Sequence, residues 1–543
     1  MAAMQAGEPR PSATSSRRAK AHNIPPVWIW VPAGVVAFGV LLPLIYLGIR
    51  TFELGDEAWQ FLIRSRNLEI LWNSAWLVFS VTAASALLAV PLAWLTTRTD
   101  LPMRRLWSVL TILPLVLPSY IAAYLFVIFF GERGDLQQFL HVLFGVERLP
   151  GIYGFGGAFL VLTLLSFPYV VLSVRSALWR MDPGIEESAR LLGNKPSKTF
   201  FRVTLPVLRP AILSGSLLVA LYTLSDFGAV SFLNFKTFTW AIYLQYGTFG
   251  RSLAAALSLV LVIFTVGLLL MEMKARGRSK YYRTGTGTIA PPTQVQLGKW
   301  RWTALIFCGL VVLVSLIIPL AVLAQWTIKG LLVGESFQSF WELTWNSISA
   351  SGMAALVTVL AALPIVIWSV RYPSWLSGLV ERMTYIGFAL PGIAVALALV
   401  FFAINYARPI YQSMPLLIFA YLVLFLPTAV GAIRTSLLQV NPKLEEAARG
   451  LGKSSFQTAR KISLPLMRSG ILAAAAMVFL LVMKELPATL ILGPTGFKTL
   501  ATSVWTYISE AFYAQAAAPS LLLVLASAGS LAFLLTKETR YTT

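Results

Sequence analysis

Cysteine, histidine and charge are all scarce in this chain of 543 residues. The single cysteine, Cys308, excludes a disulfide within the chain, and His22 and His141 are too few to make a Cys/His metal site plausible. Charged residues make up only 12% of the sequence, against about 25% in an average soluble protein, whereas 57% of the residues are hydrophobic. This composition indicates a membrane protein.

The chain also lacks a P-loop, whose pattern is G-x-x-x-x-G-K-[ST]. The stretch that ends in Gly452-Lys453-Ser454 has Ala447 where the first glycine is required. The two histidines fall in the N-terminal tail and in a predicted external loop, so a Ser/His/Asp catalytic constellation is not possible. We therefore expect no enzyme activity, no catalytic residue and no bound cofactor, and any ATP would be hydrolysed by another subunit.

Long apolar runs are what the sequence has in abundance. A membrane-spanning helix needs roughly 20 mostly apolar residues, and continuous rather than alternating runs indicate helices instead of a barrel. The first run is too long for the apolar core of a signal peptide, so we interpret it as a retained span. The twelve predicted spans are residues 27–49, 71–95, 106–130, 155–178, 209–232, 252–272, 302–327, 346–370, 380–404, 413–436, 469–492 and 515–536.

The basic residues predict the orientation of these spans. With the N-terminus in the cytoplasm, 32 of the 43 Lys and Arg residues lie in or beside cytoplasmic segments, 10 lie outside, and Lys484 lies in the membrane. The positive-inside rule therefore favours a cytoplasmic N-terminus, and an even number of spans then places the C-terminus there too. The same distribution accounts for much of the net charge of +21 without a nucleic-acid partner.

The spans divide into two similar halves. Asn73, Pro91 and Pro118 match Asn346, Pro364 and Pro391 at a constant offset of 273. Two halves with an even number of spans share one topology and are related by a pseudo-twofold axis along the membrane normal. The predicted regions are an N-terminal tail (1–26), a first half (27–272), a cytoplasmic linker rich in Gly, Thr and Pro (273–301), and a second half (302–543).

One polar stretch occurs twice. Asp182–Pro206 (the first elbow) and Asn441–Pro465 (the second elbow) share ten of 25 positions at an offset of 259. In each, an Asp or Asn suited to cap a helix precedes a proline, and Gly193 or Gly452 stands where a left-handed residue would end the helix. A second short helix is expected to end near the closing Leu-Pro pair.

Within these elbows, the acid pairs Glu186-Glu187 and Glu445-Glu446 are interpreted as charges that favour a positive helix N-terminus. Both elbows fall on the cytoplasmic face of the predicted topology.

The elbows resemble the EAA motif of ATP-binding-cassette importer permeases, in which E-A-A is followed by three residues, a glycine, nine residues and I-x-L-P. The first copy has Ser188 for an alanine and Val203 for the isoleucine. The resemblance implies the importer permease fold, two ATPase copies that each hold one elbow in a groove, and a periplasmic binding protein that delivers the substrate. The residues it assigns to ATPase coupling are Glu187, Ala189, Gly193, Phe200, Leu205, Pro206, Glu446, Ala447, Ala448, Gly452, Leu464 and Pro465.

Two further stretches narrow the resemblance to fused, double-length iron(III) permeases of bacterial inner membranes. Leu224–Val230 reads LSDFGAV and Lys484–Leu490 reads KELPATL, so that Asp226 aligns with Glu485 at the offset of 259. Close relatives with similar stretches carry thiamine or polyamines, which stay alternative cargoes. A secondary transporter is the alternative class; it predicts functional charges in the membrane but no paired elbows.

Asp226 and Glu485 are candidate residues of a substrate path. Each lies about 16 residues into its span, roughly 24 Å at 1.5 Å per residue, toward the outer end of the hydrocarbon core. Two carboxylates related by a pseudo-twofold axis can line one central pathway, and oxygen ligands suit a hard cation. The alternative is that both brace helices, Asp226 as a cap and Glu485 through a cation on another span.

Overall fold

The computed structural model describes residues 25–539, except 54, 182, 194, 248–250, 277–293, 333–339, 386 and 388–389. In this part of the chain the regular elements are helices, apart from one isolated bridge between Thr99 and Val295. Long apolar runs favour helices because a bilayer offers no water to the backbone, so its N–H and C=O groups must pair within the segment. The predicted all-α membrane fold is confirmed.

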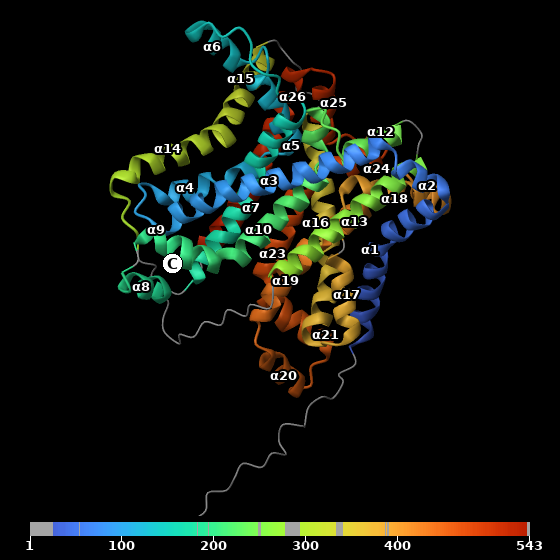
Figure 1. The fold of residues 1–543 in the computed structure, drawn as a ribbon. Coiled ribbons are helices and arrows are strands. Elements are labelled where there is room, and N and C mark those ends of the chain that lie inside the picture. Colours follow the sequence, from blue (N-terminus) through green and yellow to red (C-terminus); the bar gives the residue numbers. More distant parts are fainter. Residues whose placement is uncertain are drawn as a thin grey trace, which may run out of the picture.

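Each half is a succession of long helices with short helices between them (Figure 1). The first half contains α1 (Val27–Glu53), α2 (Asp56–Leu62), α3 (Ser65–Arg98), α4 (Arg104–Leu110), η1 (Leu113–Val116), α5 (Ser119–Phe130), α6 (Asp135–Phe144), α7 (Phe155–Arg180), α8 (Pro183–Leu191), α9 (Pro196–Thr199), η2 (Phe200–Thr204), α10 (Leu205–Ser225), α11 (Gly228–Phe232), α12 (Phe238–Gly247) and α13 (Arg251–Arg276).

The second half follows the same order. It contains η3 (Gly298–Trp300), α14 (Arg301–Val312), η4 (Leu313–Ile317), α15 (Ile318–Leu332), α16 (Phe340–Arg371), α17 (Trp375–Tyr385), α18 (Gly392–Tyr406), η7 (Arg408–Ile410), α19 (Met414–Gln439), α20 (Pro442–Gly450), α21 (Ser455–Thr458), η8 (Ala459–Ser463), α22 (Leu464–Leu466), α23 (Arg468–Met483), α24 (Pro487–Leu492), α25 (Leu500–Ser509) and α26 (Tyr513–Thr539).

The helix packing repeats between the halves. In the first half α3, α7 and α10 pack against one another, and in the second half α16, α19 and α23 do the same. The first helices cross over: α1 packs against α16, α17 and α18, while α15 packs against α5 (Figure 1). The repeated three-helix unit agrees with the predicted pseudo-symmetry, and the crossed helices interlock the two halves.

The predicted spans fall on helical segments, but 209–232, 380–404 and 469–492 are each divided between two helices. Among the described residues, eight helices are long and apolar enough to cross a membrane, two more pairs qualify only as bent units, and α18 and α26 contain shorter apolar segments. The predicted third span, 106–130, is broken: Arg104–Val116 and Ser119–Phe144 meet at 101°. The third predicted span is therefore two helical segments that meet at a sharp bend.

Prolines have different effects in different spans. Pro118 lies at the break in the third span, directly before α5, where its missing N–H cannot continue the preceding helix, and Pro114 lies just before the break, inside η1. Pro91 and Pro364, by contrast, lie inside α3 and α16, which continue through them. A proline within an apolar run therefore does not by itself predict a break in the span.

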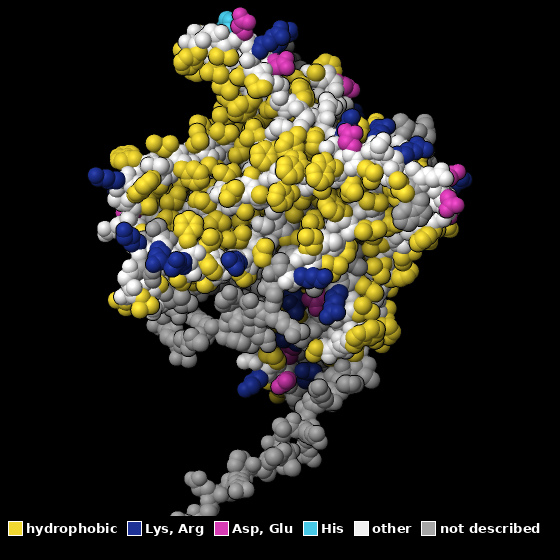
Figure 2. Space-filling view, in the orientation of Figure 1, with side chains coloured by type: hydrophobic (Ala, Val, Ile, Leu, Met, Phe, Trp, Pro, Cys, Tyr) yellow, Lys and Arg dark blue, Asp and Glu magenta, His cyan; other side chains and the backbone are white. Residues whose placement is uncertain are grey.

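The lipid-facing surface is visible in the space-filling view. Figure 2 shows hydrophobic side chains over the broad middle of the visible face, with Lys and Arg gathered toward its edges. On α3, large side chains such as Trp72, Phe79 and Leu87 are exposed in the protein alone. An apolar surface of this extent fits a bilayer environment.

Candidate functional site

Both elbows have the two helices and the turn between them that the repeated sequence predicts. In the first, α8 leads through a turn to α9, and in the second, α20 leads to α21. Gly193 and Gly452 have φ values of +82° and +81°, the left-handed conformation that glycine adopts without steric cost. The predicted helix–turn–helix shape and both helix-ending glycines are confirmed.

The caps of the second elbow are also formed. Asn441 accepts a hydrogen bond from the Lys443 N–H at 3.0 Å, and α20 begins at the next residue, Pro442. Ser454 and Gln457 make a capping box at the start of α21. The matching cap of the first elbow, Asp182, lies outside the described residues, although α8 begins at Pro183 as predicted.

The predicted end of the second short helix is wrong for the first elbow. There α9 continues through the π-helical turn η2 into α10, which starts at Leu205 without a break. Pro206 stands at the beginning of α10, where a missing N–H is tolerated. In the second elbow α22 ends at Leu466, just after the Leu-Pro pair, and the chain bends by 72° before α23.

The residues assigned to coupling divide into an outer and an inner set. Helical periodicity places every third or fourth residue on one face, so Ala189 and Ala448 face inward whereas Glu187 and Glu446, two positions earlier, face outward. Those exposed are Glu187, Gly193, Glu446, Ala447, Gly452 and Pro465. Those buried or half-buried are Ala189, Phe200, Leu205, Pro206, Ala448 and Leu464. Phe200 packs edge-on against Trp94 of α3, with ring centroids 5.6 Å apart.

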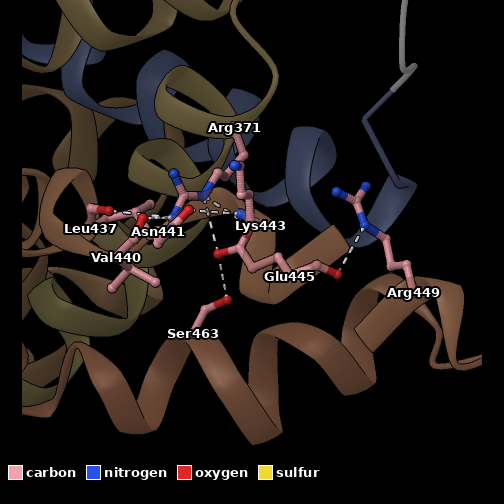
Figure 3. Close-up of polar contacts among 8 residues, drawn as sticks. All are labelled: Arg371, Leu437, Val440, Asn441, Lys443, Glu445, Arg449 and Ser463. Atoms are coloured by element: carbon pink, nitrogen blue, oxygen red, sulfur yellow. Dashed lines mark hydrogen bonds and ion pairs between the residues drawn. The ribbon is translucent and has the colours of Figure 1, made fainter. Parts of the chain in front are cut away.

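Glu186 and Glu445, the first acid of each pair, are buried rather than simply placed at a helix N-terminus. Their exposed fractions are 4% and 7%. Glu445 forms an ion pair with Arg371, whose Nε lies 2.9 Å from Oε2, and Glu445 Oε1 accepts a hydrogen bond from Ser463 at 2.8 Å (Figure 3). The earlier interpretation of these acids as helix N-terminal charges is incomplete, since each meets an arginine of another helix.

The first elbow has the same arrangement. Arg98 Nη1 lies 3.7 Å from Glu186 Oε2, and Thr204 donates a hydrogen bond to Glu186 Oε1 at 2.7 Å. Arg98 and Arg371 are related by the offset of 273, the two glutamates by 259, and Thr204 and Ser463 by 259. We call each set of arginine, glutamate and hydroxyl an Arg–Glu clamp.

Each clamp arginine also reaches a third helix. Arg98 Nη2 donates to the Leu178 carbonyl in α7 at 2.9 Å. Arg371 Nη2 donates to the carbonyls of Leu437 and Val440, at 3.3 and 3.0 Å, at the end of α19 (Figure 3). These arginines were not among the residues predicted from the sequence, although each ends a long apolar helix and the two match at the offset of 273, a pattern that could have identified them.

Asp226 and Glu485 both lie where a helix is interrupted. Asp226 follows α10, and its Oδ1 accepts from the Ala229 N–H at 2.9 Å at the start of α11. Glu485 lies between α23 and α24; its Oε1 accepts from the Ala488 N–H at 2.8 Å, and its Oε2 accepts from Thr489. Both carboxylates therefore satisfy N–H groups at the start of a short helix, in the manner of a helix cap.

Lys484 connects the two halves. Its Nζ donates to the Leu115 carbonyl at 2.8 Å, from the end of α23 to the broken third span of the first half. Leu115 lies in η1, and Pro118, three residues later, has no N–H to donate to its carbonyl, which is therefore available to accept the bond from Lys484. The ammonium group thus finds a partner on the opposite half rather than on its neighbour Glu485.

Comparison with known proteins agrees with this architecture. The family described as binding-protein-dependent transport system inner membrane component matches residues 86–277 and again 354–539, once in each half. The Fe(3+)-transport system permease protein FbpB 2 of Haemophilus influenzae is 36% identical over 519 residues, which cover 94% of this chain and 98% of that protein.

Two more distant relatives extend the comparison. The putative ferric transport system permease protein FbpB 1 of Haemophilus influenzae is 24% identical over 84% of this chain and 76% of its own length. The molybdenum transport system permease protein ModB of Escherichia coli is 32% identical, but it covers only 38% of this chain and 93% of itself. With two family matches and one relative similar along nearly its whole length, the chain belongs to the family of binding-protein-dependent transport system inner membrane components.

Proposed function

We propose that this chain is the membrane permease subunit of an ATP-driven importer, coupled to separate ATPase subunits through its two elbows. The observation that carries the proposal is the duplication of one elbow geometry, with a left-handed glycine and an exposed acid at equivalent places. A secondary transporter has no need of two matched cytoplasmic elbows. Two elbows favour two ATPase copies, one on each.

Iron(III) is the proposed cargo. Support comes from the relatives named for ferric transport, which match this fused, double-length chain over 94% and 84% of its residues. The molybdenum permease matches only 38% of this chain. Thiamine and polyamines are the alternative cargoes that the sequence leaves open.

The proposed orientation has both termini and both elbows in the cytoplasm of a bacterial inner membrane. The distribution of Lys and Arg supports it through the positive-inside rule. The clamps also support a common face, because α3 and α16, which are equivalent helices, each meet an elbow at their last residue. A periplasmic binding protein would then deliver cargo to the opposite face.

Transport would proceed by alternating access. Closure of two ATPase subunits would displace the elbows, and rigid-body rocking of the two halves would open the path alternately to each side. The hydrogen bonds of Asp226 and Glu485 to backbone N–H groups favour the bracing role for these acids over direct cargo binding.

The test is purification of the tagged chain followed by uptake into proteoliposomes with the cognate binding protein. We expect an ATP-binding-cassette ATPase to copurify, and labelled iron(III) to accumulate in preference to labelled thiamine. Collapse of the proton gradient at constant ATP should leave uptake unchanged. Uptake that follows the proton gradient and ignores ATP would instead identify a secondary transporter.

A further inference from the structure

We propose that Arg98 and Arg371 are positioning residues that bind each elbow to two spans at once, so that displacement of the elbow moves both spans together. This inference rests on the proposed function, because it assigns a role within ATPase coupling. The two Arg–Glu clamps are the observation that carries it.

Each clamp joins three separate segments through one guanidinium group. In the second half Arg371 ends α16, its Nε meets Glu445 of α20, and its Nη2 meets the last carbonyls of α19. In the first half Arg98 joins α3, α8 and the α7 carbonyl of Leu178 in the same way. An elbow held at this point cannot shift without carrying the ends of both spans.

The hydroxyl groups fix each glutamate from the opposite side. Thr204 lies in the π turn η2 and Ser463 in η8, so each glutamate also links its elbow helix to the turn that leads into the next span. The contacts of Glu445 therefore span α16, α20 and η8. A force applied to the exposed side of α20 would therefore be transmitted through these contacts to α16 and η8.

The chemistry of arginine explains why this residue occupies both places. The planar guanidinium group carries several N–H groups, so one arginine can donate to a carboxylate and to a carbonyl at the same time, whereas lysine offers a single point charge.

The burial of the clamp makes loss of either partner costly. The side chains of Arg98 and Glu186 are 1% and 5% exposed, and a buried charge left without its partner is strongly unfavourable.

Another ion pair provides a matched control. Arg434 of α19 and Glu381 of α17 lie 3.0 Å apart, with 45% of the arginine side chain exposed, and neither residue belongs to an elbow. Removal of this pair tests the loss of an ion pair near the same helices without disturbing the proposed transmission route.

The experiment compares the assembled importer carrying R371K, R98K or E381Q with the parent protein in proteoliposomes. The readout is the number of iron(III) ions imported per ATP hydrolysed. Since coupling between sites is commonly worth 5- to 150-fold, we expect about a tenfold fall for either lysine variant and none for E381Q. Partial misfolding would lower uptake and ATPase activity in proportion and leave this ratio unchanged.

An unchanged ratio in assembled R371K and R98K would overturn the proposal. If either variant does not assemble, S463A is the milder test, because it keeps the ion pair of Arg371 with Glu445 and removes one hydrogen bond of the clamp. A parental ratio in S463A would then overturn it as well. Failure of the parent chain to bind an ATPase or import iron(III) would refute the proposed function instead.

Discussion

Replacement of Gly452 by alanine isolates the backbone requirement of the second elbow. Its φ of +81° is unfavourable for any residue with a Cβ, yet a Cβ built there meets no atom within 4 Å. The expected cost is therefore conformational strain alone, about 1–2 kcal/mol for a left-handed L-residue. Because each 1.4 kcal/mol is tenfold in an equilibrium constant, the elbow should open roughly tenfold more often.

Gly450 supplies the matched control. It is the last residue of α20, it has no positive φ, and a Cβ there also meets nothing within 4 Å. Alanine in a helix is favoured over glycine by roughly 0.5–1 kcal/mol, so G450A should protect the elbow slightly. Each variant adds one methyl group, at positions two residues apart, and the two should change stability in opposite directions.

Amide hydrogen exchange across residues 441–465 measures this difference directly, because exchange reports local opening. We expect faster exchange in G452A and equal or slower exchange in G450A. Equal exchange in the two variants would refute the reasoning from backbone geometry.

A proline, whose φ is fixed near −65°, cannot adopt the conformation of Gly452 at all. An importer that carries G452P should therefore hydrolyse ATP without importing cargo.

Further predictions concern the membrane region. In G470A the new Cβ would lie 2.2 Å from the Ser436 Cβ, so this variant should lose thermal stability in detergent. Adding S436G to G470A should restore the stability. If the double variant shows no recovery, the result counts against this packing. D226A should cost about 1 kcal/mol by removing the cap of Ala229, whereas D226N keeps an oxygen acceptor. Normal iron(III) uptake by D226N is expected for a brace, and a large loss would assign Asp226 to the substrate path.

Local chemistry made most of the architecture predictable. Apolar runs of about 20 residues are visible without any knowledge of their neighbours, and they located the eight described helices that are long and apolar enough to cross a membrane. The elbows were predictable for a similar reason, because helix caps and a left-handed glycine depend on residues only a few positions apart. The apolar run did not reveal that the third span bends between Val116 and Ser119, where Pro118 lies, whereas α3 continues through Pro91.

The sequence by itself therefore determined the helical class, the two halves and the shape of both elbows. Only the tertiary structure decided that Glu186 meets Arg98, 88 positions earlier in the chain, and that Lys484 reaches the carbonyl of Leu115 in the other half. Helix periodicity predicts which face of a segment is buried, but it does not predict which other segment packs against that face. Ion pairs between distant helices depend on that packing, and two such pairs, Arg98 with Glu186 and Arg371 with Glu445, hold the elbows against the spans.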